Sequence, residues 1–75
     1  MAIVTIYTSR LTERDKQSAR GELFRGNLVR IYPTCINQGR RSTIKYQSEQ
    51  FFQDLGAKPV EGVIPDDEGY PFFKV

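Results

Sequence analysis

Arginine, lysine and tyrosine are the residues of this chain whose number and spacing could do chemistry, and that chemistry is binding. Between Arg10 and Lys45, nine Arg or Lys residues stand against three acids, and from Glu49 onward six acids stand against two lysines. The formal net charge of +2 therefore hides a basic first part and an acidic second part. Because like charges gathered on one surface attract opposite charge, this division points to a charged binding partner.

The residues that most enzyme classes need are missing. The chain has no histidine, so neither a Ser–His nor a Cys–His nucleophile pair can form. Its one cysteine, Cys35, cannot make an internal disulfide or a zinc site, and its glycines match no phosphate-binding loop. The sequence therefore predicts a noncatalytic protein with no cofactor and no metal.

Two stretches could be mistaken for reactive or metal-binding sites. Cys35 lies near Arg40 and Arg41 in the sequence, which would make its thiol reactive if they were close in space, but an inert, half-buried thiol is the more common outcome. The run Asp66-Asp67-Glu68 lacks the alternating ligand spacing of a calcium loop. With Gly69 it predicts an ordinary acidic turn.

The elements that must position these side chains begin with two strands, at residues 2–8 and 27–32, where β-branched and aromatic residues are concentrated. Pro33 ends the second strand or marks a sheet edge. Between the strands, residues 9–22 hold only two apolar side chains. An exposed loop and a short solvated helix capped by Thr12 both remain open for this stretch.

The second half predicts a third strand at residues 41–46, joined to the second in a hairpin with a basic tip. Ser48 then caps the clearest helix, residues 48–55, which Gly56 ends. Residues 58–65 are extended, and residues 70–75 are too apolar to be a free tail. This last segment either closes the core of its own chain or docks on another.

Together these elements predict a single α+β domain spanning residues 1–75. Its architecture is a small antiparallel sheet of four or five short strands with one short helix, about residues 48–55, packed on one face. The expected core combines residues of the helix and the strands: Phe51, Phe52, Leu55, Ile44, Val60 and either Val63 or Ile64.

The leading functional hypothesis is contact with a protein partner, as an inhibitor, adaptor or assembly subunit. Tyrosine, phenylalanine and arginine are residue types that interface hot spots favour, and a terminal aromatic segment could add a strand to a partner's sheet. The predicted partner-binding residues are cationic or aromatic: Arg25, Arg30, Tyr32, Arg40, Arg41, Lys45, Tyr70, Phe72 and Phe73. Self-association is a further option for so small a domain.

The alternative is a module that binds single-stranded nucleic acid. If Val29 and Ile31 face the core, Arg30 and Tyr32 share the opposite face of the sheet, and Tyr7 joins them if Val4 and Ile6 also point inward. Bases would stack on the tyrosine rings while the cations of this face and of the hairpin tip follow the phosphates.

The run Ile44-Lys45-Tyr46 followed by residues 52–60 resembles the strand–helix–glycine–strand core of small phycobilisome linker domains. Asp54 stands where that family has a basic residue before the glycine. Because this unit is very common among proteins, the resemblance implies nothing about function.

The expected setting is cytoplasmic. Residues 1–7 have neither the basic lead of a signal peptide nor an apolar run long enough to span a membrane. No membrane association is expected for that reason. A single cysteine also fits a reducing compartment.

Overall fold

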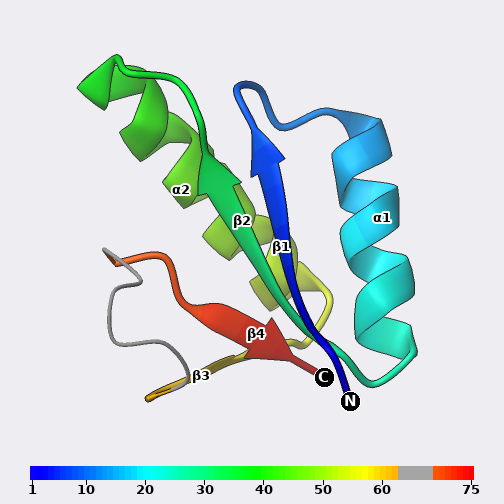
Figure 1. Ribbon diagram of the computed structural model, residues 1–75. Helices are drawn as coiled ribbons and strands as arrows, with labels where there is room; N and C mark the ends of the chain where they lie inside the picture. The colour runs from blue at the N-terminus through cyan, green and yellow to red at the C-terminus, as the bar shows by residue number, and fades with distance from the viewer. Residues whose placement is uncertain (63–68) are drawn as a thin grey trace.

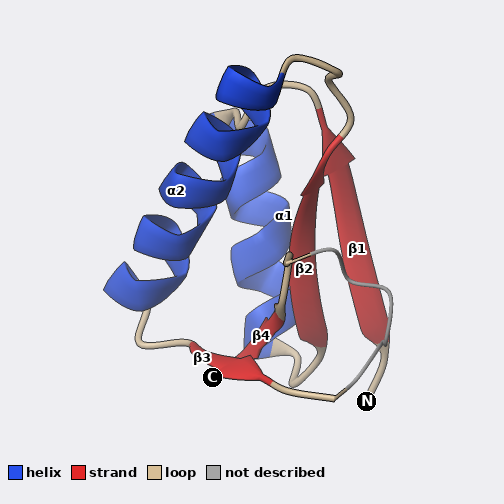
Figure 2. Ribbon diagram, turned by 90° about the vertical axis from the view of Figure 1, so that its left-hand side faces the viewer, coloured by secondary structure: helices blue, strands red, loops and turns tan. Residues whose placement is uncertain are grey.

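The computed structural model describes residues 1–62 and 69–75, which form one layer of strands and one layer of helices (Figures 1 and 2). The elements follow one another as β1 (Ile3–Thr8), α1 (Glu13–Phe24), β2 (Leu28–Pro33), α2 (Gln38–Asp54), β3 (Lys58–Val60) and β4 (Phe72–Lys74). Figure 2 shows both helices on the same side of the sheet. The other side of the sheet is called the open face below.

The sheet is mixed, with the strand order β1-β2-β4-β3. β1 and β2 are parallel and in register from Ile3 opposite Leu28 to Thr8 opposite Pro33, while β4 lies antiparallel between β2 and β3. The α+β class is confirmed. The prediction of a wholly antiparallel sheet was wrong. The helix α1 returns the chain to the end of the sheet at which β1 begins, so β2 runs parallel to β1.

Of the two alternatives left open for residues 9–22, a loop and a helix capped by Thr12, the structure has the helix, α1. Thr12 caps it with a capping box: its hydroxyl accepts from the N–H of Asp15, and the Asp15 carboxylate accepts from the N–H of Thr12. The buried side of the helix is carried by Ala19 and Leu23, one turn apart. The stretch considered in the sequence, residues 9–22, ends one residue before Leu23. It therefore lacks half of the apolar stripe that packs the helix on the sheet.

α2 is the largest correction. Residues 41–46, predicted as a strand, belong to this helix, which begins after Asn37 rather than at Ser48. The Asn37 side chain caps it by accepting from the N–H of Arg40 at 2.9 Å. There is therefore no hairpin with a basic tip and no short helix limited to residues 48–55. The likeness to phycobilisome linker domains fails with them, because its first strand is helical here.

Ser48 explains why this helix is hard to see in the sequence. The buried side of α2 carries Ile44, Ser48 and Phe52, each one turn from the next. A serine in the middle of that stripe interrupts the apolar pattern. Its hydroxyl donates to the Ile44 carbonyl at 2.7 Å, so the buried oxygen has a partner and the helix keeps its contact with the sheet.

The core lies between the helices and the sheet. It is formed by Ala19, Leu23, Val29, Ile31, Ile44, Phe52, Ala57 and Phe73, with Phe51 and Leu55 packed against it. The Phe52 and Phe73 rings stack at 4.3 Å between centroids. The predicted roles of Phe52 and Ile44 are confirmed, whereas Val63 and Ile64 lie outside the described residues. No helix among the described residues is long and apolar enough to cross a membrane.

The two edges of the sheet differ. β3 has three residues, and Lys58 and Pro59 blunt that edge. β1 has six, with no charge, proline or glycine. Ala2 and Thr8 direct their carbonyls to β2, accepting from its chain at 3.0 and 2.9 Å. Because these directions alternate, Ile3, Thr5 and Tyr7 point their N–H and C=O groups away from β2, where the described chain supplies no strand.

Candidate binding surface

Side-chain alternation divides β1 and β2 between two surfaces. Four apolar side chains belong to the core or pack against it and so point toward the helices: Val4, Ile6, Val29 and Ile31. Their strand neighbours point the other way, which places Tyr7, Arg30 and Tyr32 on the open face. The condition left open for these strands, that Val4, Ile6, Val29 and Ile31 face the core, is therefore met.

Three tyrosines form a row across the sheet, called the tyrosine row below. The Tyr7 and Tyr32 rings, on neighbouring strands, have centroids 5.8 Å apart. Tyr70, two residues before β4, lies beside Tyr32, and these two rings meet edge to face at 5.1 Å. Tyr7, at one end of the row, is 65% exposed, whereas Tyr32 and Tyr70 are half-buried. The row therefore has one exposed ring, Tyr7, packed against the half-buried ring of Tyr32, which in turn contacts the half-buried ring of Tyr70.

Three cations surround the row. The guanidinium of Arg41 lies 5.6 Å from the Tyr32 centroid and 5.7 Å from that of Tyr70. Lys45, one turn further along α2, has its ammonium 5.6 Å from the Tyr70 ring. Arg30 lies 5.2 Å from the Tyr32 ring. Electrostatic attraction between a cation and a ring face holds such contacts, so the rings orient the charges.

Arg41 is held in place by the loop between β2 and α2. Its Nη1 donates to the carbonyls of Pro33 at 3.1 Å and Cys35 at 3.0 Å. A hydrogen bond with the Tyr32 side chain raises the pKa of Arg41 against the opposing effect of burial, with a further contribution from Tyr70. The guanidinium is thus a fixed positive charge beside the tyrosine row. Cys35 takes part through its backbone only.

Arg30 is the buried member of the group, at 7% exposure. Its guanidinium lies 4.7 Å from the Phe72 centroid, and its Nη2 donates to the Thr5 hydroxyl at 3.3 Å. Within the described residues its Nε has no hydrogen-bond partner. Burying an ionised group is costly unless it is paired, so Arg30 adds a strong positive potential beneath the row rather than an accessible contact.

The cations near the row are not neutralised by ion pairs within the described part of the chain. The two pairs found there join Lys16 to Glu13 and Arg25 to Glu22, both on or next to α1. Asp66, Asp67 and Glu68, the acidic run of the sequence, lie outside the described residues. Arg30, Arg41 and Lys45, together with the tyrosine row, are called the cation–tyrosine cluster below.

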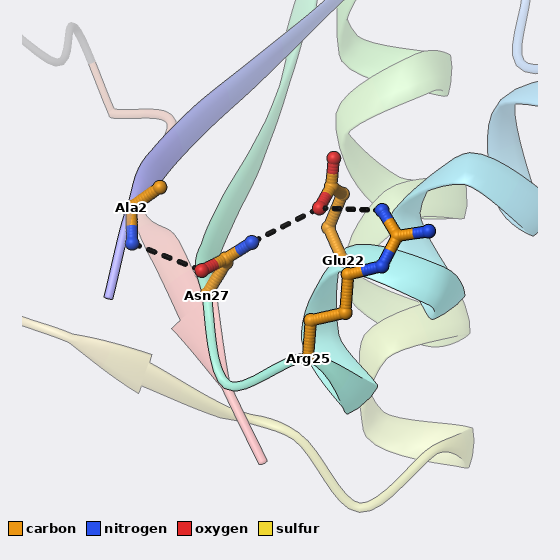
Figure 3. Close-up of polar contacts among 4 residues, drawn as sticks. All are labelled: Ala2, Glu22, Arg25 and Asn27. Carbon is orange, nitrogen blue, oxygen red and sulfur yellow. Dashed lines mark hydrogen bonds and ion pairs between the residues drawn. The ribbon is translucent and has the colours of Figure 1, made fainter.

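Arg25 does not belong to this cluster. Figure 3 shows it at the end of α1, where its Nη1 lies 3.3 Å from the Glu22 carboxylate. The same carboxylate accepts from the Asn27 side chain at 3.0 Å, and the Asn27 oxygen accepts from the N–H of Ala2 at 2.9 Å. This network joins α1 to the starts of β1 and β2, at the opposite end of the strands from Tyr7 and Tyr32.

The other predicted partner-binding residues are either buried in the chain or exposed next to the cluster. Phe72 and Phe73 are 1% and 5% exposed, so the C-terminal segment closes the core of its own chain. Arg40 is exposed in the first turn of α2, next to Arg41. The sequence predicted Arg30, Tyr32 and Lys45 on one sheet face with Arg41 at a hairpin tip, and Tyr70 in a separate C-terminal segment. The structure brings all five together, with Arg41 and Lys45 coming from a helix and not from a hairpin.

Two contributors were not among the predicted partner-binding residues. Thr5 holds Arg30 from the neighbouring strand, and Tyr7 supplies the exposed ring of the row. The period-two alternation of residues 3–8 carries the signal for both, once Val4 and Ile6 are assigned to the core. No group of three or more His, Cys, Asp or Glu side chains gathers to hold a metal among residues 1–62 and 69–75.

Comparison with known protein families, with curated proteins and with solved structures finds no match for this chain. Function is therefore argued from the cation–tyrosine cluster itself, because a fold hosts many functions and only a site distinguishes them.

Proposed function

We propose that this chain is a noncatalytic binding protein that holds single-stranded nucleic acid on the cation–tyrosine cluster. One observation carries the proposal: three tyrosine rings in a row beside three cations that have no carboxylate partner in the described chain. Rings stack on bases of any sequence, and cations follow the phosphates that link them. In the cluster, each of the three cations lies between 5.2 and 5.7 Å from the centroid of a tyrosine ring, so rings and cations can contact the same strand.

The exposure of each member assigns its role. Tyr7, the most exposed ring, stacks on a base. Arg41 and Lys45, half-buried beside the row, contact phosphate oxygens. Arg30 is enclosed and acts through its field alone. The burial of Phe72 and Phe73 removes the support that the C-terminal segment gave to a protein partner, and so nucleic acid becomes the better-supported ligand.

The first test compares two tyrosines of similar exposure. Tyr7→Ala removes the free ring of the row, whereas Tyr46→Ala removes a ring that is 69% exposed on α2. Loss of one stacking ring is expected to cost about 1–3 kcal/mol, which raises the Kd roughly 5- to 150-fold for Tyr7→Ala. Fluorescence anisotropy with a labelled oligothymidylate of about ten nucleotides measures it. Equal affinity of the two variants would contradict the proposal.

Salt dependence tests the phosphate contacts separately. If about three phosphates are neutralised, the Kd rises about 20-fold between about 50 and about 200 mM salt. Lys45→Gln should lower the slope, while Arg20→Gln, an exposed cation on α1, serves as the control. A salt-independent affinity would show that whatever binds here does not bind through phosphates.

The acidic run supplies a further control, because its negative charge repels a phosphate chain wherever it lies. Replacing Asp66 and Asp67 with Asn, and Glu68 with Gln, removes three negative charges from a chain whose net charge is +2. The triple variant is expected to bind the same oligonucleotide more tightly than the unsubstituted chain. A triple variant that fails to bind would leave the cluster without a nucleic-acid ligand.

A further inference from the structure

The free edge of β1 has the features that other sheet edges avoid. It is six residues long, apolar or hydroxylic throughout, and bears no lysine, proline or bulge. Such an edge is a template for pairing with another strand. The contrast with β3, which is short and carries Lys58 and Pro59, shows that only one of the two edges is protected.

We propose that β1 pairs antiparallel with β1 of a second copy of this chain, forming a two-fold dimer with a continuous sheet. The outward backbone groups fix the register, because residues that direct N–H and C=O to the edge must face each other. Those residues are Ile3, Thr5 and Tyr7. Centring the two-fold on Thr5 places Thr5 opposite its own copy and Ile3 opposite Tyr7, and uses the whole strand.

The exposed side chains of β1 complement each other in this register. Ile3 and Tyr7 are 55% and 65% exposed, and they become cross-strand neighbours on the open face of the dimer. Pairs of an aromatic and a β-branched residue stabilise antiparallel strands, as do pairs of threonines. No charged side chain of the strand meets a like charge, because β1 carries none.

α1 favours a second copy as the occupant through its charges. Arg14, Ser18 and Glu22 lie one turn apart on α1, on the side away from Arg20, which contacts Phe51 of α2, and Glu22 is tied through Asn27 to the start of β1 (Figure 3). A two-fold at the middle of β1 brings the two α1 helices together antiparallel. Ser18 then lies at the crossing, with Arg14 of one copy opposite Glu22 of the other.

The oligomeric state is the first readout. Sedimentation equilibrium from about 10 µM to about 1 mM, the range of weak small interfaces, should give a mass rising from 8.6 kDa toward twice that value. Ile3→Lys should raise the dimer Kd at least tenfold. Ile36→Lys, at a residue 94% exposed in the loop after β2, should leave it unchanged. A chain that stays monomeric throughout, or a dimer indifferent to Ile3→Lys, overturns the proposal.

Disulfide trapping tests the register through formation of a covalent bond and not through a loss of affinity. In a Cys35→Ser background, Thr5→Cys should cross-link to itself under mild oxidation, because Cα atoms of a hydrogen-bonded antiparallel pair are about 5.5 Å apart. Ile3→Cys alone should not, since its copy lies roughly 13 Å away along the strand. A mixture of Ile3→Cys and Tyr7→Cys chains should cross-link. Trapping of Ile3→Cys alone, without Thr5→Cys, overturns this register.

The sedimentation and cross-linking measurements contain no nucleic acid, so they test self-pairing separately from the proposed function. Ile3 itself lies outside the cation–tyrosine cluster, although its cross-strand neighbour Tyr7 belongs to it. If a foreign strand occupied the edge instead, the purified chain would remain monomeric, which is the result that overturns self-pairing.

Discussion

At the scale of single residues, the cation–tyrosine cluster is defined by what surrounds each charge. Arg30 and Arg41 come from different elements and approach the same Tyr32 ring, yet one is buried and the other half-buried. The sequence indicated that Arg30 and Tyr32 share a face, because strand alternation fixes direction. It could not indicate the burial of Arg30, which depends on Phe72 from the far end of the chain.

Asp15 gives a residue-scale prediction about pH. Burial raises the pKa of Asp15, but hydrogen bonds from the Thr12 N–H and from the Thr8 and Thr12 hydroxyls, with the charge of Arg14, outweigh it and leave the pKa below 3.8. A carboxyl whose pKa is lowered by folding stabilises the folded state above its unfolded pKa, and this contribution is lost as pH falls through the folded pKa.

Asp15→Asn should therefore destabilise the chain at neutral pH, and the difference from the unsubstituted chain should shrink below about pH 4. Urea unfolding followed by circular dichroism at several pH values measures this difference. Asp54→Asn is the control, because its neighbour Gln50 can still donate to the amide oxygen. A difference that persists unchanged to the lowest pH would mean that the Asp15 charge does not stabilise α1.

At the scale of elements, the first two strands were predictable, whereas the third was wrong and the bounds of both helices were missed. Residues 2–8 and 27–32 contain concentrated β-branched side chains that fit only one interpretation, and the structure places β1 and β2 there. α1 and α2 bury narrow stripes in which a small or polar residue, Ala19 or Ser48, occupies a core position. Thr12 was recognised in the sequence as a possible cap of α1, whereas the cap of α2, Asn37, was missed.

Two glycines in or next to the helices should respond in opposite directions to alanine. Gly21 lies inside α1, and a Cβ added there meets no atom within 4 Å, so Gly21→Ala should stabilise the chain by about 1 kcal/mol. Gly56 follows α2 with φ of +78°, a conformation that alanine adopts only with strain. Gly56→Ala should destabilise by about 1 kcal/mol. Thermal melts of both variants measure the pair, and shifts of the same sign would contradict this account.

At the scale of the whole molecule, the strand order was beyond the sequence. Neither the parallel pairing of β1 with β2 nor the central place of β4 follows from any local pattern, because both depend on which elements share a core. The charge division was visible in the sequence, but its placement was not. Only the fold shows that Lys45 of α2 and Tyr70 before β4 lie together.

The core makes a prediction for the whole chain. Phe52 is 1% exposed and stacks on Phe73 across the two layers, so Phe52→Ala should destabilise by about 3–5 kcal/mol, enough to unfold so small a protein. Phe51→Ala changes the same residue type one position earlier, where the ring is half-buried, and should cost much less. Chemical unfolding compares the two, and similar midpoints would reject the assigned core.

The central position of β4 also imposes a sequence of events in time. A nascent chain that has emerged as far as β2 already possesses both members of its parallel pair and the helix that connects them. β3 then emerges without a neighbour, since the strand it pairs with is synthesised after it. Assembly of this protein must therefore wait for Phe72–Lys74, and a ribosome stalled before those residues would display an unfinished sheet to its surroundings.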